Sequence, residues 1–117
     1  ESKLSNGQDY FDLLKATFPG GSITGCPKIR SMEIISEIEK ENRGIYTGAL
    51  FFKAFGKYFD SNIAIRTIVI RRGFATFRVG GGIVYDSKPE SEYNETIYKG
   101  KSILDILGID YDSYLEE

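Results

Sequence analysis

The middle of the chain, residues 45–84, leaves few choices of fold. It is rich in β-branched and aromatic residues that are interrupted by Gly and Asp, a pattern typical of successive antiparallel strands. Helical patterns precede and follow it, so the sequence predicts an α+β fold in which an antiparallel sheet is flanked by helices. The expected strands cover residues 44–55, 58–70 and 74–84, with turns at 56–57 and 71–73.

Two helices are expected before this stretch. Apolar residues at helical spacing predict the first over 8–16, and it ends before a Pro-Gly-Gly turn. The second is expected over 27–40, because a core-facing apolar stripe follows Ser22, Thr24 and Pro27. These three residues would supply a hydroxyl cap and a proline in the first turn.

Composition limits the classes of function. The 117 residues suit one domain, and a formal net charge of −2 without a run of Lys or Arg makes nucleic acid and anionic membranes unexpected partners. No apolar run approaches the roughly 20 residues that span a bilayer, and the polar N-terminus does not resemble a signal peptide, so a cytoplasmic location is expected. With Cys26 as the single cysteine and no histidine, any metal should be a hard, oxygen-bound ion such as Mg²⁺.

A glycine-rich turn at residues 18–28, FPGGSITGCPK, leads into the second helix. Free backbone N–H groups in such a turn can bind an anion at the positive end of the helix dipole. A tight turn with a helix cap explains the same residues. The turn is not a Walker A loop, because Pro27 separates Gly25 and Cys26 from Lys28.

Two features of the predicted sheet are unusual. Gly80, Gly81 and Gly82 follow one another at the end of a strand, which either lets a ligand approach the backbone or forms a bulge or bend. Arg66 interrupts the apolar run at 62–70, where its guanidinium needs an anionic partner. That partner is either an internal carboxylate or the carboxylate of a ligand.

A last helix is expected over 89–107, with Ser87 as its cap. Glu92, Glu95 and Lys99 share one face of it, because they are spaced i, i+3 and i+7. Two carboxylates and an ammonium in this arrangement can hold Mg²⁺ beside a substrate carboxylate. They can equally form an ordinary solvated face. The buried side is expected to contain Ile97, Ile103, Leu104 and Leu107.

Four stretches of the chain together resemble one family, the chorismate-utilising enzymes, which include anthranilate, aminodeoxychorismate, isochorismate and salicylate synthases. The resemblance covers residues 12–107. It implies that residues 1–117 are the C-terminal portion of a chorismate-binding catalytic domain whose N-terminal portion precedes Glu1. The stretches are FPGGSITGCPKIRSMEIISEIE (18–39), GIYTGALFF (44–52), IAIRT (63–67) and GGGIVYDSKPESEYNETIYKGKSIL (80–104).

Within the family, the motif FPGGSITG at residues 18–25 resembles that of the aminodeoxychorismate synthases, whereas anthranilate synthases usually have Ala-Gly-Thr at this turn. Cys26 stands where the family usually has Ala, a small packing substitution. Carried over by motif position, the resemblance implies that Glu95 binds Mg²⁺ and that Glu92 binds it too or supports it. The positions implied to contact chorismate, chiefly its carboxylates, are Ser22, Tyr46, Arg66, the backbone of Gly82 and Lys99.

The resemblance also implies a reaction, the magnesium-assisted displacement of the chorismate hydroxyl. In the aminodeoxychorismate branch a lysine attacks first, and ammonia from a partner glutaminase subunit or domain then displaces it. The product is 4-amino-4-deoxychorismate, on the route to p-aminobenzoate and folate. The nucleophile and the acid are expected upstream of Glu1, so no catalytic residue is expected in this chain, and the chain alone should be inactive.

Two other functions fit the same residues. One is anthranilate synthase component I of tryptophan biosynthesis, and the other is a non-catalytic module with the same fold. The presence or absence of acid and lysine motifs upstream would distinguish them. Because the predicted strand at 63–70 would normally be covered on both sides, the chain is also expected to self-associate.

Overall fold

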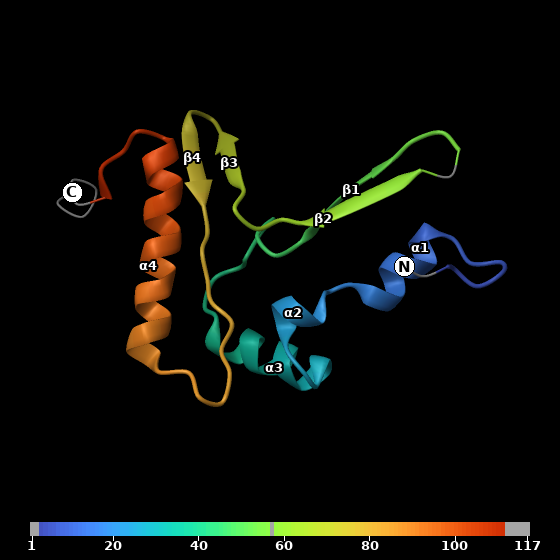
Figure 1. The fold of residues 1–117 in the computed structure, drawn as a ribbon, viewed down its shortest axis with the longest axis horizontal. Helices are drawn as coiled ribbons and strands as arrows, with labels where there is room; N and C mark the ends of the chain where they lie inside the picture. The colour runs from blue at the N-terminus through green and yellow to red at the C-terminus, as the bar shows by residue number, and fades with distance from the viewer. Residues whose placement is uncertain (1–2, 57, 112–117) are drawn as a thin grey trace. The chain divides into compact units, whose positions relative to one another are not determined.

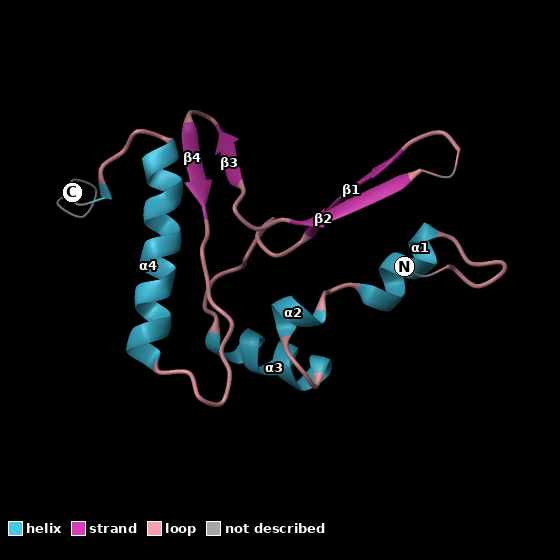
Figure 2. Ribbon diagram, viewed as in Figure 1, coloured by secondary structure: helices cyan, strands magenta, loops and turns pink. Residues whose placement is uncertain are grey.

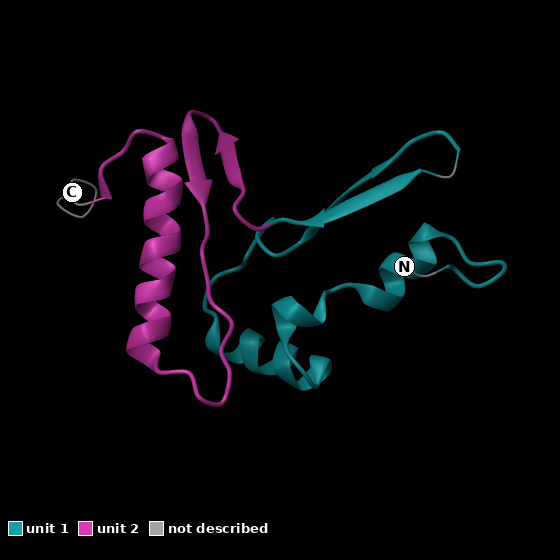
Figure 3. Ribbon diagram, viewed as in Figure 1, with its two compact units in different colours: residues 1–64 teal, residues 65–117 magenta. Residues whose placement is uncertain are grey.

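The computed structural model describes residues 3–56 and 58–111 (Figure 1). They contain both helices and antiparallel strands (Figure 2), so the predicted α+β class is confirmed. The chain divides into two compact units, residues 1–64 and residues 65–117 (Figure 3), and each is described by itself. Within the described residues, every helix is too short or too polar to cross a membrane.

The first unit begins with α1, Tyr10–Thr17, close to the helix predicted over 8–16. The helix starts at Tyr10 because Asp9 and Asp12 form a capping box. Asp9 Oδ1 accepts from the N–H of Phe11 at 2.8 Å, and Asp12 Oδ2 accepts from the N–H of Asp9 at 3.0 Å. Side chains therefore satisfy donors that the first helical turn leaves free.

The glycine-rich turn folds into α2, Gly21–Thr24, which precedes α3, Lys28–Ile38. The hydroxyl cap predicted for the second helix is therefore wrong, because Ser22 and Thr24 lie inside α2 and Thr24 Oγ1 donates back to the carbonyl of Gly20. Pro27 itself is the N-cap of α3 and lacks a side-chain cap bond. The helix ends at Ile38, two residues before the predicted end at Lys40.

The sheet of the first unit is a hairpin of β1, Ala49–Lys53, and β2, Phe59–Ile63, paired so that Ala49 lies opposite Ile63. The strand predicted over 44–55 is shorter because its first residues form a turn, in which the N–H of Gly48 donates to the carbonyl of Ile45 at 2.9 Å. Part of the turn predicted at 56–57 lies outside the described residues, since Lys57 is not described.

Aromatic rings pack α1 against this hairpin. The rings of Tyr10 and Phe59 stack with centroids 5.3 Å apart, and Phe11 meets Phe51 edge to face at 6.4 Å. Lys53 places its ammonium 4.6 Å from the centroid of the Tyr10 ring. Such ring contacts and cation–π contacts add orientation to the hydrophobic burial that holds the helix.

The second unit begins with a hairpin of β3, Ile68–Arg71, and β4, Phe74–Phe77. Arg72 and Gly73 form its turn, with φ of 52° and 84°, which is the left-handed pair that a two-residue hairpin requires. This confirms the turn predicted at 71–73. The single strand predicted over 58–70 is wrong, because residues 64–67 separate β2 from β3.

The interruption has a visible cause. Ala64, fully buried, pairs its N–H with the carbonyl of Gly48 and its carbonyl with the N–H of Thr47, both at 2.9 Å. Arg66 then has a φ of 51°, a left-handed conformation that cannot continue a strand.

The strand predicted over 74–84 stops at Phe77, and residues 78–84 have no regular secondary structure. The three glycines lack side chains that could pack in a sheet. The last helix, α4, is Pro89–Ile106, one residue shorter than predicted. Its N-cap is Lys88 without a side-chain bond, so the prediction that Ser87 caps the helix is wrong. Ile103 and Leu104 are buried as predicted, but Leu107 is exposed.

Candidate functional site

In the first unit, Ser22 lies exposed in the single turn of α2. The N–H groups of Thr24 and Gly25 close that turn onto Gly20 and Gly21 at 3.2 and 2.8 Å. The glycine-rich segment is thus a tight helical turn, but it lacks the side-chain helix cap that this interpretation included. A role for Ser22 in binding an anion stays a prediction.

Tyr46 is half-buried in the turn that precedes β1. Its N–H donates to the carbonyl of Arg43 at 3.2 Å, and Thr47 Oγ1 donates to the Tyr46 carbonyl at 2.5 Å. Thr47 has a φ of 65°, which is rare for a β-branched residue and costs about 1–3 kcal/mol. The backbone beside Tyr46 is therefore strained, and the surrounding contacts must hold it in place.

Arg43 supplies one of those contacts. Its Nε and Nη2 donate to both carboxylate oxygens of Glu39 at 2.7 and 2.5 Å, and its Nη1 donates to Thr47 Oγ1 at 3.2 Å. The hydrogen bond to Glu39 raises the pKa of Arg43, burial opposes this, and the negative charge of Glu39 raises the pKa further. The guanidinium therefore stays charged and links the end of α3 to the turn of Tyr46.

In the second unit, the predicted face of α4 carries Glu92, Glu95 and Lys99. Lys99 Nζ donates to Glu95 Oε1 at 2.5 Å and to the carbonyl of Gly80 at 3.0 Å. The first contact is the ordinary i, i+4 pair that one interpretation expected. The second joins the helix face to the glycine segment, a connection that spacing alone did not predict.

Glu92 meets the same segment. Its Oε1 accepts from Ser87 Oγ at 2.6 Å, and Ser87 Oγ in turn accepts from the N–H of Val84 at 3.0 Å. A Cβ added to Gly81 would lie 3.0 Å from Glu92 Oε2, tighter than nearly all real contacts. Gly81 therefore admits the Glu92 carboxylate against its backbone, and approach of a ligand to the three glycines stays a prediction.

Gly82 and Arg66 complete the predicted residues of this unit. Gly82 is exposed, and a Cβ added there would meet open space. Arg66 is exposed as well, at the left-handed residue before β3. Its guanidinium is therefore accessible to an anion in solution, and its contact with chorismate stays a prediction.

Glu92 and Glu95 carry oxygen donors that suit Mg²⁺. Their hydrogen bonds to Ser87 and Lys99 engage Oε1 of each carboxylate, and each has a second oxygen, the hard donor that Mg²⁺ prefers. Across residues 3–56 and 58–111, no three His, Cys, Asp or Glu side chains cluster as a complete metal site. Because Mg²⁺ commonly takes one or two carboxylates together with water and substrate oxygens, the pair fits as part of a site.

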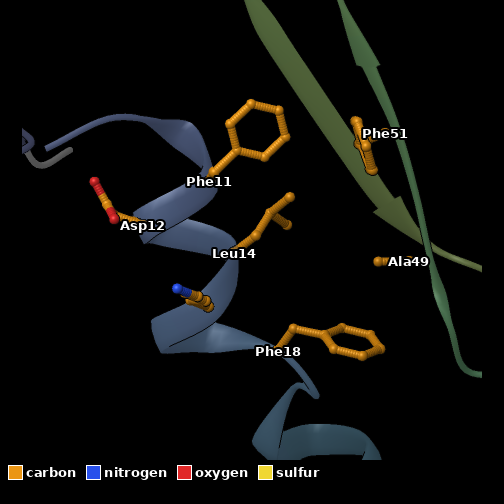
Figure 4. A pocket seen from close by; sticks show the side chains of 7 residues that line it. Phe11, Asp12, Leu14, Phe18, Ala49 and Phe51 are labelled. Atoms are coloured by element: carbon orange, nitrogen blue, oxygen red, sulfur yellow. The ribbon is translucent and has the colours of Figure 1, made fainter.

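A hollow lies elsewhere in the first unit, between α1 and β1 (Figure 4). It has a volume of about 600 Å³, and its lining contains none of the predicted site residues. Phe11, Leu14 and Phe18 line it from the helix side, and Ala49 and Phe51 line it from the strand side. It is an apolar groove and contributes no group to the proposed chemistry.

The comparisons with known proteins bear on the whole chain. A sequence profile of the family described as chorismate binding enzyme matches residues 1–105. The chain belongs to this family. A probable aminodeoxychorismate synthase, chloroplastic, of Oryza sativa subsp. japonica is 53% identical over 91 residues, which are 78% of this chain and 10% of that protein. Anthranilate synthase component 1 of Aquifex aeolicus is 45% identical over 114 residues, 97% of this chain and 23% of that protein.

Anthranilate synthase component 1 of Acinetobacter calcoaceticus is similar too, with 48% identity over 104 residues, 89% of this chain and 21% of that protein. The chain thus spans about a tenth to a quarter of the length of these curated relatives. Family membership confirms the resemblance found in the sequence. The relatives carry two different activities in their names, so membership does not select the product.

Two contacts were not predicted from the sequence. Ser87 was interpreted as a helix cap, but its hydroxyl orients Glu92, and its position five residues before Glu92 gave no signal of this. Arg43 was not singled out in the sequence. It lies four residues after Glu39 but beyond the end of α3, so the rule for ion pairs on a helix did not apply to it.

Proposed function

We propose that the chain is part of a longer, Mg²⁺-dependent enzyme that converts chorismate and ammonia to 4-amino-4-deoxychorismate. The observation that carries the proposal is the contact of Lys99 with both Gly80 and Glu95. It joins a cation, a carboxylate and an accessible glycine backbone in one place within the second unit. A substrate with two carboxylates needs cations and backbone donors, and a divalent ion needs carboxylates.

The residues of the chain then have distinct tasks. In the second unit, Lys99 and Arg66 bind substrate carboxylates, and Gly82 allows the substrate to approach the backbone. For Ser22 and Tyr46 of the first unit, contact with chorismate is proposed from the resemblance alone. Glu92 and Glu95 hold Mg²⁺, which when bound would stabilise negative charge on a substrate carboxylate. Ser87 keeps Glu92 directed toward the glycine segment. The nucleophilic lysine and the acid are proposed to come from outside this chain.

The choice of 4-amino-4-deoxychorismate depends on the turn FPGGSITG, whose wording resembles the aminodeoxychorismate branch. The identity to the rice relative agrees with it. A second candidate is the formation of anthranilate, favoured by the anthranilate synthase relative from Aquifex aeolicus, which matches nearly the whole chain. A non-catalytic module with this fold is the remaining alternative.

Two further parts of the proposal concern the setting of the enzyme. A glutaminase subunit or domain would supply ammonia, in keeping with the words "component 1" in the names of the bacterial relatives. A cytoplasmic location, without nucleic acid or membrane partners, is proposed from the composition alone. Neither part is needed for the test below.

The test uses the full-length protein with chorismate, Mg²⁺ and saturating ammonia, and the products are separated and identified by chromatography and mass spectrometry. We expect 4-amino-4-deoxychorismate as the main product. Anthranilate as the main product would support the second candidate. No consumption of chorismate would support the non-catalytic alternative. The 117-residue chain, assayed in parallel, should consume none, because a missing nucleophile and acid abolish catalysis together.

A further inference from the structure

The backbone beside Tyr46 is in an unusual conformation that demands an explanation. Among the described residues, Thr47, Arg66 and Arg72 are the ones other than glycine with a left-handed φ. Arg72 belongs to a tight hairpin turn, where this conformation is required. The turn at Thr47 does not explain its conformation in the same way. A turn with a left-handed third residue favours Gly or Asn at that position and disfavours a β-branched side chain.

Strain of this kind persists only where surrounding contacts enforce it, and it concentrates at functional sites. The contacts at Thr47 come from two sides. Its N–H donates to the carbonyl of Ala64 at 2.9 Å, and its Oγ1 accepts from Arg43 Nη1 at 3.2 Å while donating to the carbonyl of Tyr46. The hydroxyl is thereby oriented in full, as acceptor from the guanidinium and donor to the Tyr46 backbone.

Arg43 can hold Thr47 because Glu39 holds Arg43. The carboxylate of Glu39 receives two parallel hydrogen bonds from the guanidinium, a geometry that fixes its plane. The Arg43 and Glu39 side chains are 26% and 39% exposed, whereas those of the Arg30–Glu33 pair on the surface of α3 are 59% and 54% exposed. The first pair is therefore better shielded from solvent and from salt.

We propose that Glu39 and Arg43 fix Thr47 in its left-handed conformation and thereby position Tyr46 for the substrate, which makes Arg43 a positioning residue. The inference deepens the proposed function and rests on it. The backbone of Tyr46 is held on both sides, since its N–H donates to the carbonyl of Arg43 at 3.2 Å and its own carbonyl accepts from Thr47 Oγ1. Arg43 itself contacts no reacting atom in this proposal.

The test compares Arg43→Gln, Arg43→Lys and Thr47→Val with Arg30→Gln in the full-length protein. Arg30→Gln is a matched control, because it removes the same charge from an exposed pair on α3, whereas Arg43 lies beyond the end of that helix. In Arg43→Gln we expect the KM for chorismate to rise about tenfold with kcat changed less than about threefold, the result of losing substrate positioning. Thr47→Val should do the same, Arg43→Lys should recover part of the loss, and Arg30→Gln should match the wild type.

A double variant separates positioning from general damage. If Arg43 acts through Thr47, the combination of Arg43→Gln and Thr47→Val should raise KM no further than either change alone, because residues that act as a unit are not additive. Multiplying KM effects would overturn the proposal. A purely structural role would instead lower the melting temperature of Arg43→Gln and leave KM unchanged, and that outcome overturns it too.

Hydrogen exchange of the backbone amides of Thr47 and Gly48 gives a readout that needs no substrate. Exchange at both amides should be faster in Arg43→Gln than in Arg30→Gln by at least about fivefold, if the guanidinium stabilises the turn. Equal exchange in the two variants would overturn the inference even if chorismate turnover is found. Absence of chorismate turnover in the wild type would instead refute the proposed function, so the two failures are distinguishable.

Discussion

The two units each contain a Glu and a basic residue spaced i, i+4 as an ion pair, and the two pairs differ in how they are built. Glu39 and Arg43 in the first unit share two parallel hydrogen bonds, and the side chains are 26% exposed for Arg43 and 39% for Glu39. Glu95 and Lys99 in the second unit share a single contact, and their side chains are 53% and 42% exposed.

We call the Glu39–Arg43 pair structural, because its geometry is fixed. We call the Glu95–Lys99 pair exchangeable, because its charges can also bind a ligand. Arg presents a planar fork that suits one fixed geometry, whereas Lys is a compact charge on a flexible stem with three donors. Within the described residues the hydrogen bonds of Lys99 go to Glu95 and Gly80, which leaves one of its three donors for a ligand. The same spacing in sequence therefore supports a turn in one unit and presents charges to solvent in the other.

The largest effect is expected from Glu95→Gln in the full-length protein. The variant keeps size and helix propensity and removes one charge from the proposed Mg²⁺ ligand, so activity should fall at least ~100-fold, which corresponds to ~2.7 kcal/mol. The measurement is chorismate consumption with saturating ammonia across a Mg²⁺ titration, alongside thermal melts.

The control for this variant is Glu90→Gln, which removes the same charge near the start of α4, off the proposed face. It should change activity by less than about threefold, as surface substitutions usually do. Near-parental activity of Glu95→Gln at low Mg²⁺, or an equal loss in both variants, would mean that the α4 face is only a solvated surface. The difference between the two ion pairs would then have no functional meaning.

A smaller effect is expected from Ser87→Ala, which removes the hydroxyl that donates to Glu92 at 2.6 Å. The Mg²⁺ concentration for half-maximal activity should rise about tenfold, because groups that orient metal ligands contribute on that scale. Thermal shifts with added Mg²⁺ provide a second readout. Ser102→Ala is the control, since its hydroxyl donates to the Tyr98 carbonyl within the same helix. An equal response of both serine variants would remove Ser87 from the site.

The comparison of the two ion pairs can be tested directly by stability. Arg43→Gln should lower the free energy of unfolding by ~1–2 kcal/mol, because it removes the two parallel hydrogen bonds that the guanidinium donates to Glu39. Lys99→Gln should lower it by less than ~0.5 kcal/mol, the usual contribution of an exposed pair. Denaturant unfolding of the two variants measures both values. If Lys99→Gln were the more destabilising, the assignment of a structural and an exchangeable pair would be reversed.

The smallest expected effect is self-association of the 117-residue chain. It was expected because the predicted strand at 63–70 would normally be covered on both sides. That argument fails, because residues 64–67 interrupt the strand. Apolar side chains from both units are nevertheless exposed, such as Ile29 at 74% and Ile70 at 77%. Light scattering at micromolar concentration should give about twice the monomer mass or more, since exposed apolar patches favour association. A monodisperse monomer would contradict this expectation.

The helices were the predictable part of the fold. Residues 8–16 and 89–107 were predicted as helices and are observed as α1 and α4 within two residues at each end. Their signals are local, because apolar spacing and a proline at the first position act within a few residues. The caps were not predictable to the same degree. The hydroxyl of Ser87 could bond either to the backbone at the start of the helix or to Glu92, and in the structure it donates to Glu92.

The strands were predicted in kind and misjudged in extent. Residues 58–70 look like one strand in sequence, but they contribute to two strands in separate hairpins. The cause lies in Ala64, whose backbone groups pair with Thr47 and Gly48, residues that are distant in sequence. Pairings of this kind depend on register between strands, which single-sequence patterns do not contain.

The sequence by itself determined the α+β class, the positions of the helices, the family, and the alignment of Glu92, Glu95 and Lys99 on one helix face. Those conclusions need only local periodicity and motif wording, both of which are carried by neighbouring residues. The tertiary structure decided that Lys99 reaches Gly80, that Ser87 serves Glu92, and that Arg43 supports the strained turn at Thr47. These contacts join segments whose approach depends on the folded path of the chain, because a hydrogen bond forms only when both partners arrive within about 3 Å of each other.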